Sequence, residues 1–165
     1  MRQRLLAFDG RAMSVLGEAE AAFAAEPGFV DAGLALIGDE ADYVGSGATW
    51  LLKSFLERGG TLSAPQTQAL ITALPRAAHW STQLHLSQSI RHLSLTATQA
   101  TACTDWIGPL LMHKRPFLRA WSLDALAHVA QAHAEYREEF RKALRQASED
   151  PAASVRARAR RCGPG

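Results

Sequence analysis

The sequence predicts an all-α fold of antiparallel helix pairs, and two repeated patterns carry this prediction. Between Arg115 and Val129, side chains suited to a buried face recur at i, i+4, i+7, i+8 and i+11, the spacing of one face of a helix. The same set of offsets recurs from starting points that are 38, 36 and 37 residues apart along the chain. These starting points are Val44, Thr82, Leu118 and Val155. A regular period of this length indicates repeated helix pairs.

A second stripe has the same period and belongs to the second helix of each pair. Adding 37 once and then again to positions 69, 70 and 73 gives six further positions, and all nine residues are apolar. They are Ala69, Leu70, Ala73, Trp106, Ile107, Leu110, Ala143, Leu144 and Ala147. Two helices with one apolar face each can bury both faces only by stacking on the next pair. We therefore expect about three and a half units over residues 39–165, ending on a helix from 152 to 162 that has no second helix.

Local signals place the helix ends. Acidic residues from Asp39 to Asp42 suit a helix N-terminus, and Gly59-Gly60 suits a helix end. Ser63, with Gln66 three residues later, predicts a capping box for the second helix, and Pro109 should kink or end a later one. Residues 1–38 break the period. We expect them to form a divergent N-terminal cap with helices over 11–26 and 29–37, which gives about nine helices in total.

Composition indicates a soluble globular protein. Of the 165 residues, 47% are hydrophobic and 21% charged, and no apolar run reaches the roughly 18 residues of a membrane span. The segment MRQRLLAFDGR has too short an apolar stretch for a signal peptide, so a cytoplasmic location is expected, with no membrane partner. Two isolated cysteines, Cys103 and Cys162, are expected to be buried rather than bonded to each other or to a metal.

Charge is unevenly distributed along the chain. Residues 1–60 hold five Lys or Arg against nine Asp or Glu, a balance of −4, whereas residues 114–165 hold eleven against six, a balance of +5. This polarity could steer an acidic partner to the C-terminal part or favour head-to-tail contacts between copies.

No catalytic constellation is recognisable in the sequence. The letters of Asp39 to Asp42 match a helicase box, but no phosphate loop of the form GxxxxGK[ST] accompanies them. The six histidines lack the i, i+4 spacing typical of helical metal sites, and no GxSxG elbow is present. We therefore expect no enzyme activity, no cofactor and no metal.

The repeats resemble HEAT repeats, the two-helix units of armadillo-type α-solenoids, over residues 39–162. Pro116 with Leu118-Arg119, and Pro151 with Val155-Arg156, match the proline and the apolar residue followed by arginine that often open such units. The resemblance implies a short right-handed solenoid whose second helices line a concave, partner-binding face. The candidate contacts there are Gln68, Asp105, Arg141, Lys142 and Arg145. The first hypothesis is thus a non-enzymatic scaffold that binds another protein.

Two alternatives stay open. The basic patch of Arg156, Arg158, Arg160 and Arg161 could contact nucleic acid phosphates. Trp121 and Asp124, one helical turn apart, resemble the aromatic and acidic groups of HEAT-like DNA-alkylation glycosylases. A third hypothesis is self-association, because the last helix has no second helix to cover its apolar residues Val155, Ala159 and Cys162.

Overall fold

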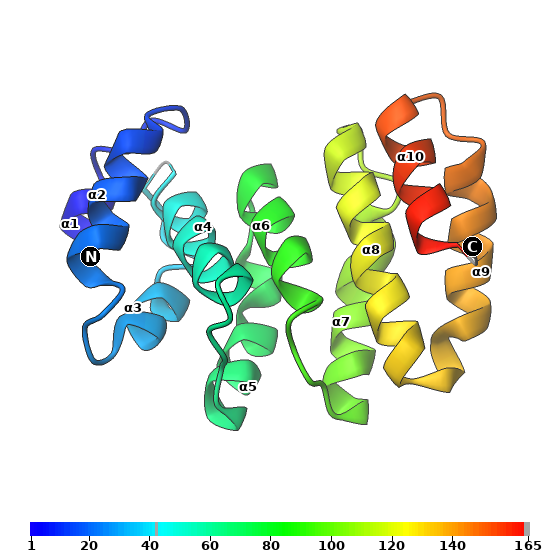
Figure 1. Cartoon of the computed structure of the whole chain (residues 1–165), viewed down its shortest axis with the longest axis horizontal. Helices are drawn as coiled ribbons and strands as arrows, with labels where there is room; N and C mark the ends of the chain where they lie inside the picture. Colours follow the sequence, from blue (N-terminus) through cyan, green and yellow to red (C-terminus); the bar gives the residue numbers. More distant parts are fainter. Residues whose placement is uncertain (42, 164–165) are drawn as a thin grey trace. The chain divides into compact units, whose positions relative to one another are not determined.

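A computed structural model describes residues 1–41 and 43–163, and this part of the chain is all-α, without a strand (Figure 1). It contains ten α-helices and two short 3-10 helices. The chain divides into two compact units, Met1–Leu93 and Ser94–Gly165, which are described separately below. The boundary between the units falls inside the second predicted repeat. Within the described residues, no helix has both the length and the apolar character to cross a membrane.

The first unit is built around one central helix. Its helices are α1 (Arg2–Leu5), α2 (Met13–Phe23), α3 (Phe29–Ala35), α4 (Val44–Glu57), α5 (Ala64–Ala73), η1 (Leu74–Arg76) and α6 (Trp80–Ile90). Helix α4 packs along α6 and also contacts α1, α2 and α3, while α3 packs on α5. The first six residues of α4, Val44 through Thr49, are small or apolar and are all buried, which suits a helix at the centre of the unit. Residues 1–38 thus cover α4, and they include the short α1 that periodicity did not predict.

The second unit is also built around one central helix, α8. Its helices are α7 (Ala97–Leu110), α8 (Pro116–Ala132), η2 (Ala134–Tyr136), α9 (Arg137–Ser148) and α10 (Ala153–Cys162). Helix α8 contacts α7, α9 and α10, and α9 also packs on α10. Leu118, Leu123 and Leu126 of α8 are fully buried. Val155 and Ala159 of α10 are covered by the same chain, so they do not require the second subunit that the sequence suggested.

Helix ends agree with the sequence at some sites and differ at others. The capping box of Ser63 and Gln66 is present at the start of α5. Helix α7 ends at Leu110, one residue after Pro109, as expected. Helix α4, however, begins at Val44 rather than at Asp39, which instead accepts a hydrogen bond from the Ala41 amide. Asp42, Pro164 and Gly165 lie outside the described residues.

The predicted stripe of the second helices is partly wrong. Its positions in α7 and α9 are buried or half-buried, but Ala69 in α5 is exposed. Ile71 lies on the inner side of α5 in its place, next to Leu70 and Thr67. Burying the larger isoleucine removes more apolar surface from water than burying alanine, so the helix turns that side inward.

Polar contacts join α4 to α6. His85 donates a hydrogen bond from Nδ1 to the Ser46 carbonyl oxygen at 3.1 Å and lies 3.3 Å from Thr49 Oγ1. Burial lowers the pKa of His85 to about 4, and the charge of Lys53 acts in the same direction. The imidazole is therefore neutral at physiological pH and serves as a buried donor between two helices.

We expect Gly45→Ala to destabilise the first unit and Gly17→Ala to stabilise it. A Cβ at Gly45 would lie 2.8 Å from the backbone oxygen of Ile37, whereas one at Gly17 would meet nothing within 4 Å. The first change should lower the free energy of unfolding by about 1–3 kcal/mol, and the second should raise it by about 0.5–1 kcal/mol. Urea denaturation followed by circular dichroism measures both. Equal effects of the two substitutions would contradict the close approach of α4 to the end of α3.

We expect His85 to make stability fall with acid. Because its folded pKa lies below the unfolded value near 6.5, the unfolded chain takes up a proton first as the pH drops from about 6.5 to about 4. This group should remove up to about 3 kcal/mol of stability across that window. His85→Gln should flatten this part of the stability profile. A profile of His85→Gln as steep as that of the wild type between pH 6.5 and pH 4 would contradict the buried, neutral imidazole.

Candidate functional site

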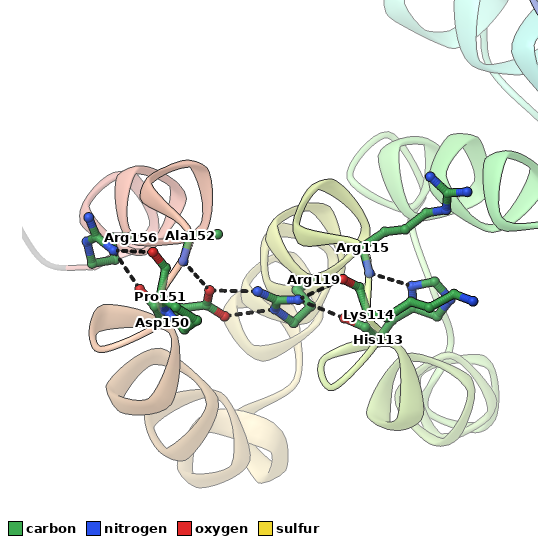
Figure 2. A network of polar contacts seen from close by, with 8 residues as sticks. All are labelled: His113, Lys114, Arg115, Arg119, Asp150, Pro151, Ala152 and Arg156. Atoms are coloured by element: carbon green, nitrogen blue, oxygen red, sulfur yellow. Dashed lines mark hydrogen bonds and ion pairs between the residues drawn. The ribbon is translucent and has the colours of Figure 1, made fainter.

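A network around Arg119 ties the start of α8 to the start of α10 (Figure 2). The guanidinium donates from Nε and Nη2 to the two carboxylate oxygens of Asp150, at 2.8 and 2.7 Å. Its Nη1 donates to the carbonyl oxygens of His113 and Lys114, at 2.8 and 3.4 Å. The side chains of Arg119 and Asp150 are only 15% and 11% exposed, so this two-pronged ion pair is shielded from solvent.

Asp150 and His113 have matching roles at the starts of their helices. Asp150 Oδ1 accepts from the Ala152 amide, and His113 Nδ1 accepts from the Arg115 amide. The Arg119 guanidinium, with help from the Ala152 amide, holds the pKa of the Asp150 carboxyl below its usual range. Burial and then the charges of Lys114, Arg115 and Arg119 lower the pKa of His113, which favours the neutral, accepting imidazole.

Arg156 repeats the contacts that Arg119 makes with backbone carbonyl groups. Its Nη1 donates to the carbonyl oxygens of Asp150 and Pro151, at 2.7 and 2.9 Å. The bonded carbonyls lie six and five residues before each arginine, and Arg156 follows Arg119 by 37 residues. The apolar-arginine pairs on which the family resemblance rests therefore close the turn before a helix.

Arg158 makes a second polar contact between α8 and α10. Its guanidinium lies 3.7 Å from the ring centroid of Trp121 and donates to Asp124 Oδ1 at 2.8 Å. Both charged side chains are largely buried, at 11% and 14% exposure. Trp121 and Asp124, the two residues that suggested a glycosylase-like site, therefore support helix packing through Arg158.

The four arginines of the basic patch thus have different surroundings. Arg156 and Arg158 are bonded within the unit, and Arg160 and Arg161 are exposed. The structure thus divides the predicted basic patch into two bonded and two exposed arginines.

An apolar groove with a basic edge lies among α8, α9 and α10. Its volume is about 650 Å³. The lining residues are Ala127, Ala130, Gln131, Arg137, Phe140, Arg141, Leu144, Arg145 and Cys162. Phe140 and Leu144 are half-buried, so the groove offers apolar surface that the unit itself does not cover completely. Such concave, mainly apolar surfaces with a few charged groups are typical of binding sites.

Three arginines border this groove from one side of α9. Arg137, Arg141 and Arg145 follow each other at four-residue spacing, so the row is about 12 Å long. Glu138 contacts Arg141 at 2.9 Å and Arg145 at 3.8 Å, but all three side chains are more than 60% exposed. Exposed pairs of this kind contribute little, so a partner can displace Glu138 at small cost.

Cys162 lies where the groove meets the Arg158 contact. Its sulfur is 3.8 Å from Asp124 Oδ1. Burial raises the pKa of the Cys162 thiol to about 11, and the Asp124 charge adds to this effect. The thiol is therefore protonated at neutral pH and serves as part of the apolar floor.

The candidate contacts from the sequence belong to both units. Arg141 and Arg145 line the groove, whereas Lys142, also on α9, is exposed but does not line it. Asp105 is exposed on α7. Gln68 lies on α5 of the other unit and donates to Thr72 Oγ1 at 3.2 Å. Sequence reasoning missed the apolar part of the groove, because Leu144 was assigned to the core stripe.

One serine and histidine contact was also missed. Ser81 Oγ lies 2.7 Å from His79 Nδ1 and 2.6 Å from Ser46 Oγ. His79 Nδ1 accepts from the Ser81 amide as the cap of α6, so the pair closes the start of a helix. Because the two residues are two positions apart, they follow no nucleophile motif.

The described residues contain no cluster of three or more His, Cys, Asp or Glu that could hold a metal ion. In comparisons with protein-family models, curated proteins and solved structures, nothing matched this chain.

We expect Asp150→Asn to reduce the dependence of stability on acid. The lowered folded pKa means that this carboxylate stabilises the fold above its unfolded pKa of about 3.9 and loses that effect as the pH falls through the folded value. Urea midpoints of the variant should therefore be lower at pH 7 but approach those of the wild type as the pH falls below the folded pKa of Asp150. Asp105→Asn removes an exposed carboxylate as a matched control. Parallel profiles for wild type and Asp150→Asn would contradict the Arg119 contact.

Proposed function

We propose that this chain is a HEAT-like α-solenoid scaffold without enzymatic activity, and that it binds another protein. Support for the repeat comes from equivalent contacts at a fixed spacing. The carbonyl contacts of Arg119 and Arg156 are 37 residues apart. The side chains of Asp39, His113 and Asp150 each accept a hydrogen bond from the amide two residues later. Asp39 and His113 are two periods of 37 residues apart, and His113 and Asp150 are one period apart.

The binding surface in this proposal is the groove of α8, α9 and α10. The observation that carries it is the combination of an apolar floor, formed mainly by Phe140 and Leu144, with the arginine row of α9. An amphipathic helix docks in such a groove through its apolar face and places its charged residues along the edge. The three arginines of the row, Arg137, Arg141 and Arg145, can pair with carboxylates that are also four residues apart on a partner helix. The occupant is therefore an acidic amphipathic helix of a partner protein.

Nucleic acid is the less favoured occupant. Phosphate binding draws on several unpaired cations, and single strands also need aromatic faces on which bases stack. Trp121 is already stacked against Arg158, and Arg156 is bonded to carbonyl oxygens. The cations that border the groove are next to apolar surface, which suits a protein segment better.

We expect Arg141→Glu combined with Arg145→Glu to weaken binding of an acidic helix by about tenfold or more, because two attractions become repulsions. The probe is a labelled helical peptide with leucines on one face and glutamates four residues apart beside them. Fluorescence anisotropy measures its affinity. Lys142→Glu, on the same helix but outside the groove, is the matched control, and thermal unfolding should be similar for both variants.

A second peptide makes the experiment decisive. With lysine in place of glutamate, it should bind the doubly reversed variant better than the wild type. NMR signals of Phe140 and Leu144 should shift on binding. If the wild type binds a labelled DNA duplex at low salt and ignores the acidic peptide, the nucleic-acid alternative replaces the scaffold proposal.

A further inference from the structure

A second pocket lies in the first unit, where α4 and α6 begin. Its volume is about 620 Å³, and small-molecule sites usually measure about 300–1,000 Å³. Its described lining residues all lie between Ile37 and Thr82, so the pocket is complete within one unit. The lining includes two charged side chains, two rings and one buried hydroxyl, which belong to Glu40, Arg76, Tyr43, His79 and Thr82.

The hydroxyl of Thr82 has no hydrogen-bond partner among the described residues, although Thr82 is only 2% exposed. The hydroxyl of Ser46, which also lines the pocket, is instead bonded to that of Ser81 at 2.6 Å. In the described chain, the fully enclosed hydroxyls without a partner are those of Thr104 and Ser122, so the Thr82 oxygen keeps some accessible surface. A nearly buried hydroxyl without a partner is unfavourable, and a ligand in the pocket can supply the partner.

Two opposite charges border the same pocket without being paired. Glu40 and Arg76 are exposed, and in the part of the chain that the structure describes neither side chain forms a hydrogen bond or ion pair. Asp39, by contrast, is held by Arg2 in a two-pronged contact at 2.6 and 3.1 Å. A Cβ at Gly38 would lie 2.8 Å from Cβ of Arg76, so this glycine lets the arginine stem lie directly against the backbone.

The start of α4 favours a carboxylate in this pocket. The helix has 14 residues, and Gly45 and Ser46, at its positive end, line the pocket. No described side chain caps this end. Its N-cap residue, Tyr43, has a φ of +63°, a strained conformation for a bulky residue that is often found at ligand sites.

The neighbouring charges disfavour a ligand of one sign. Residues 39–42 read Asp-Glu-Ala-Asp, so a simple anion would meet an acidic stretch of sequence. A simple cation would meet Arg76 and the positive end of α4. A small molecule that carries both charges close together matches the two unpaired groups.

We propose that this pocket binds a free α-amino acid. Arg76, the Thr82 hydroxyl and the start of α4 bind the carboxylate, and Glu40 binds the ammonium group. The rings of Tyr43 and His79, whose centroids are 5.2 Å apart, form a wall for the side chain of the ligand. No bond forms or breaks, and the ligand stabilises the unit that surrounds it.

The experiment begins with a thermal-shift screen of the whole chain against the twenty common amino acids, followed by calorimetric titration. At least one should bind with a dissociation constant below about 1 mM. The same compound without its amino group, or without its carboxyl group, should bind at least about tenfold more weakly. Its dipeptide should also bind more weakly, because the two charges of a dipeptide are farther apart.

Variants assign the contacts. Arg76→Gln and Glu40→Gln each remove one charge from an exposed side chain and should weaken binding by about tenfold or more. Thr82→Val keeps the shape but removes the hydroxyl, so it should weaken binding about tenfold while the free protein remains at least as stable as the wild type. Arg11→Gln and Glu26→Gln change exposed residues of the same unit outside the pocket, and they should bind like the wild type.

Three results would overturn the proposal. They are the absence of binding by any amino acid, equally tight binding of the compound without its amino group, and unchanged binding by Arg76→Gln and Glu40→Gln. The pocket and the groove on α9 belong to different units and are tested with different ligands, so failure of one proposal is distinguishable from failure of the other.

Discussion

The structure depends on the burial of one face of each short helix against another helix. The helices contain between 4 and 17 residues, and helices of this length are marginal in water on their own. Helices α4 and α8 obtain their stability from contact on several sides, and their inner leucines are 0–2% exposed. Each helix is thus stable only in the presence of its neighbours, and the spacing of helices along the chain is constrained by this need.

Apolar packing alone leaves neighbouring helices free to slide, and the polar contacts restrict this freedom. Asp150 can satisfy both Arg119 and the Ala152 amide only when α8 and α10 are in one register. The Arg158 contact with Asp124 and Trp121 adds a second fixed point on the same pair of helices. Largely buried ion pairs often add little net stability because of desolvation, so their main effect here is on register.

Much of the fold could be predicted from local sequence, because periodic apolar residues and capping signals act within a few residues. Ser63 and Gln66 lie three residues apart, and both their identity and their spacing are visible in the chain. Ala69 could not be placed correctly, because its exposure depends on competition with Ile71 for interior volume. The α1 helix is only four residues long and contains too few positions to establish a period.

The candidate site could be predicted only in part, for a related reason. The arginine row of α9 is visible as a four-residue spacing. The groove is not, since it exists only where Phe140 and Leu144 remain incompletely covered by residues from α8 and α10. The bond between Arg158 and Asp124 joins residues that are 34 positions apart. No pattern within a helix distinguishes this arginine from the exposed Arg160.

This distinction decides how the basic character of residues 114–165 is interpreted. Arg119 and Arg158 bond to residues near or on a neighbouring helix, and Arg156 bonds to the turn before its own helix, so all three are used in structure. Their charge is partly or wholly compensated by carboxylates or backbone carbonyl groups. The row on α9 faces a groove instead, and its contacts with Glu138 are exposed and easily exchanged. The net charge of +5 is therefore not a uniform surface for a polyanion, and Arg137, Arg141 and Arg145 place three of its cations beside the apolar side chains of the groove.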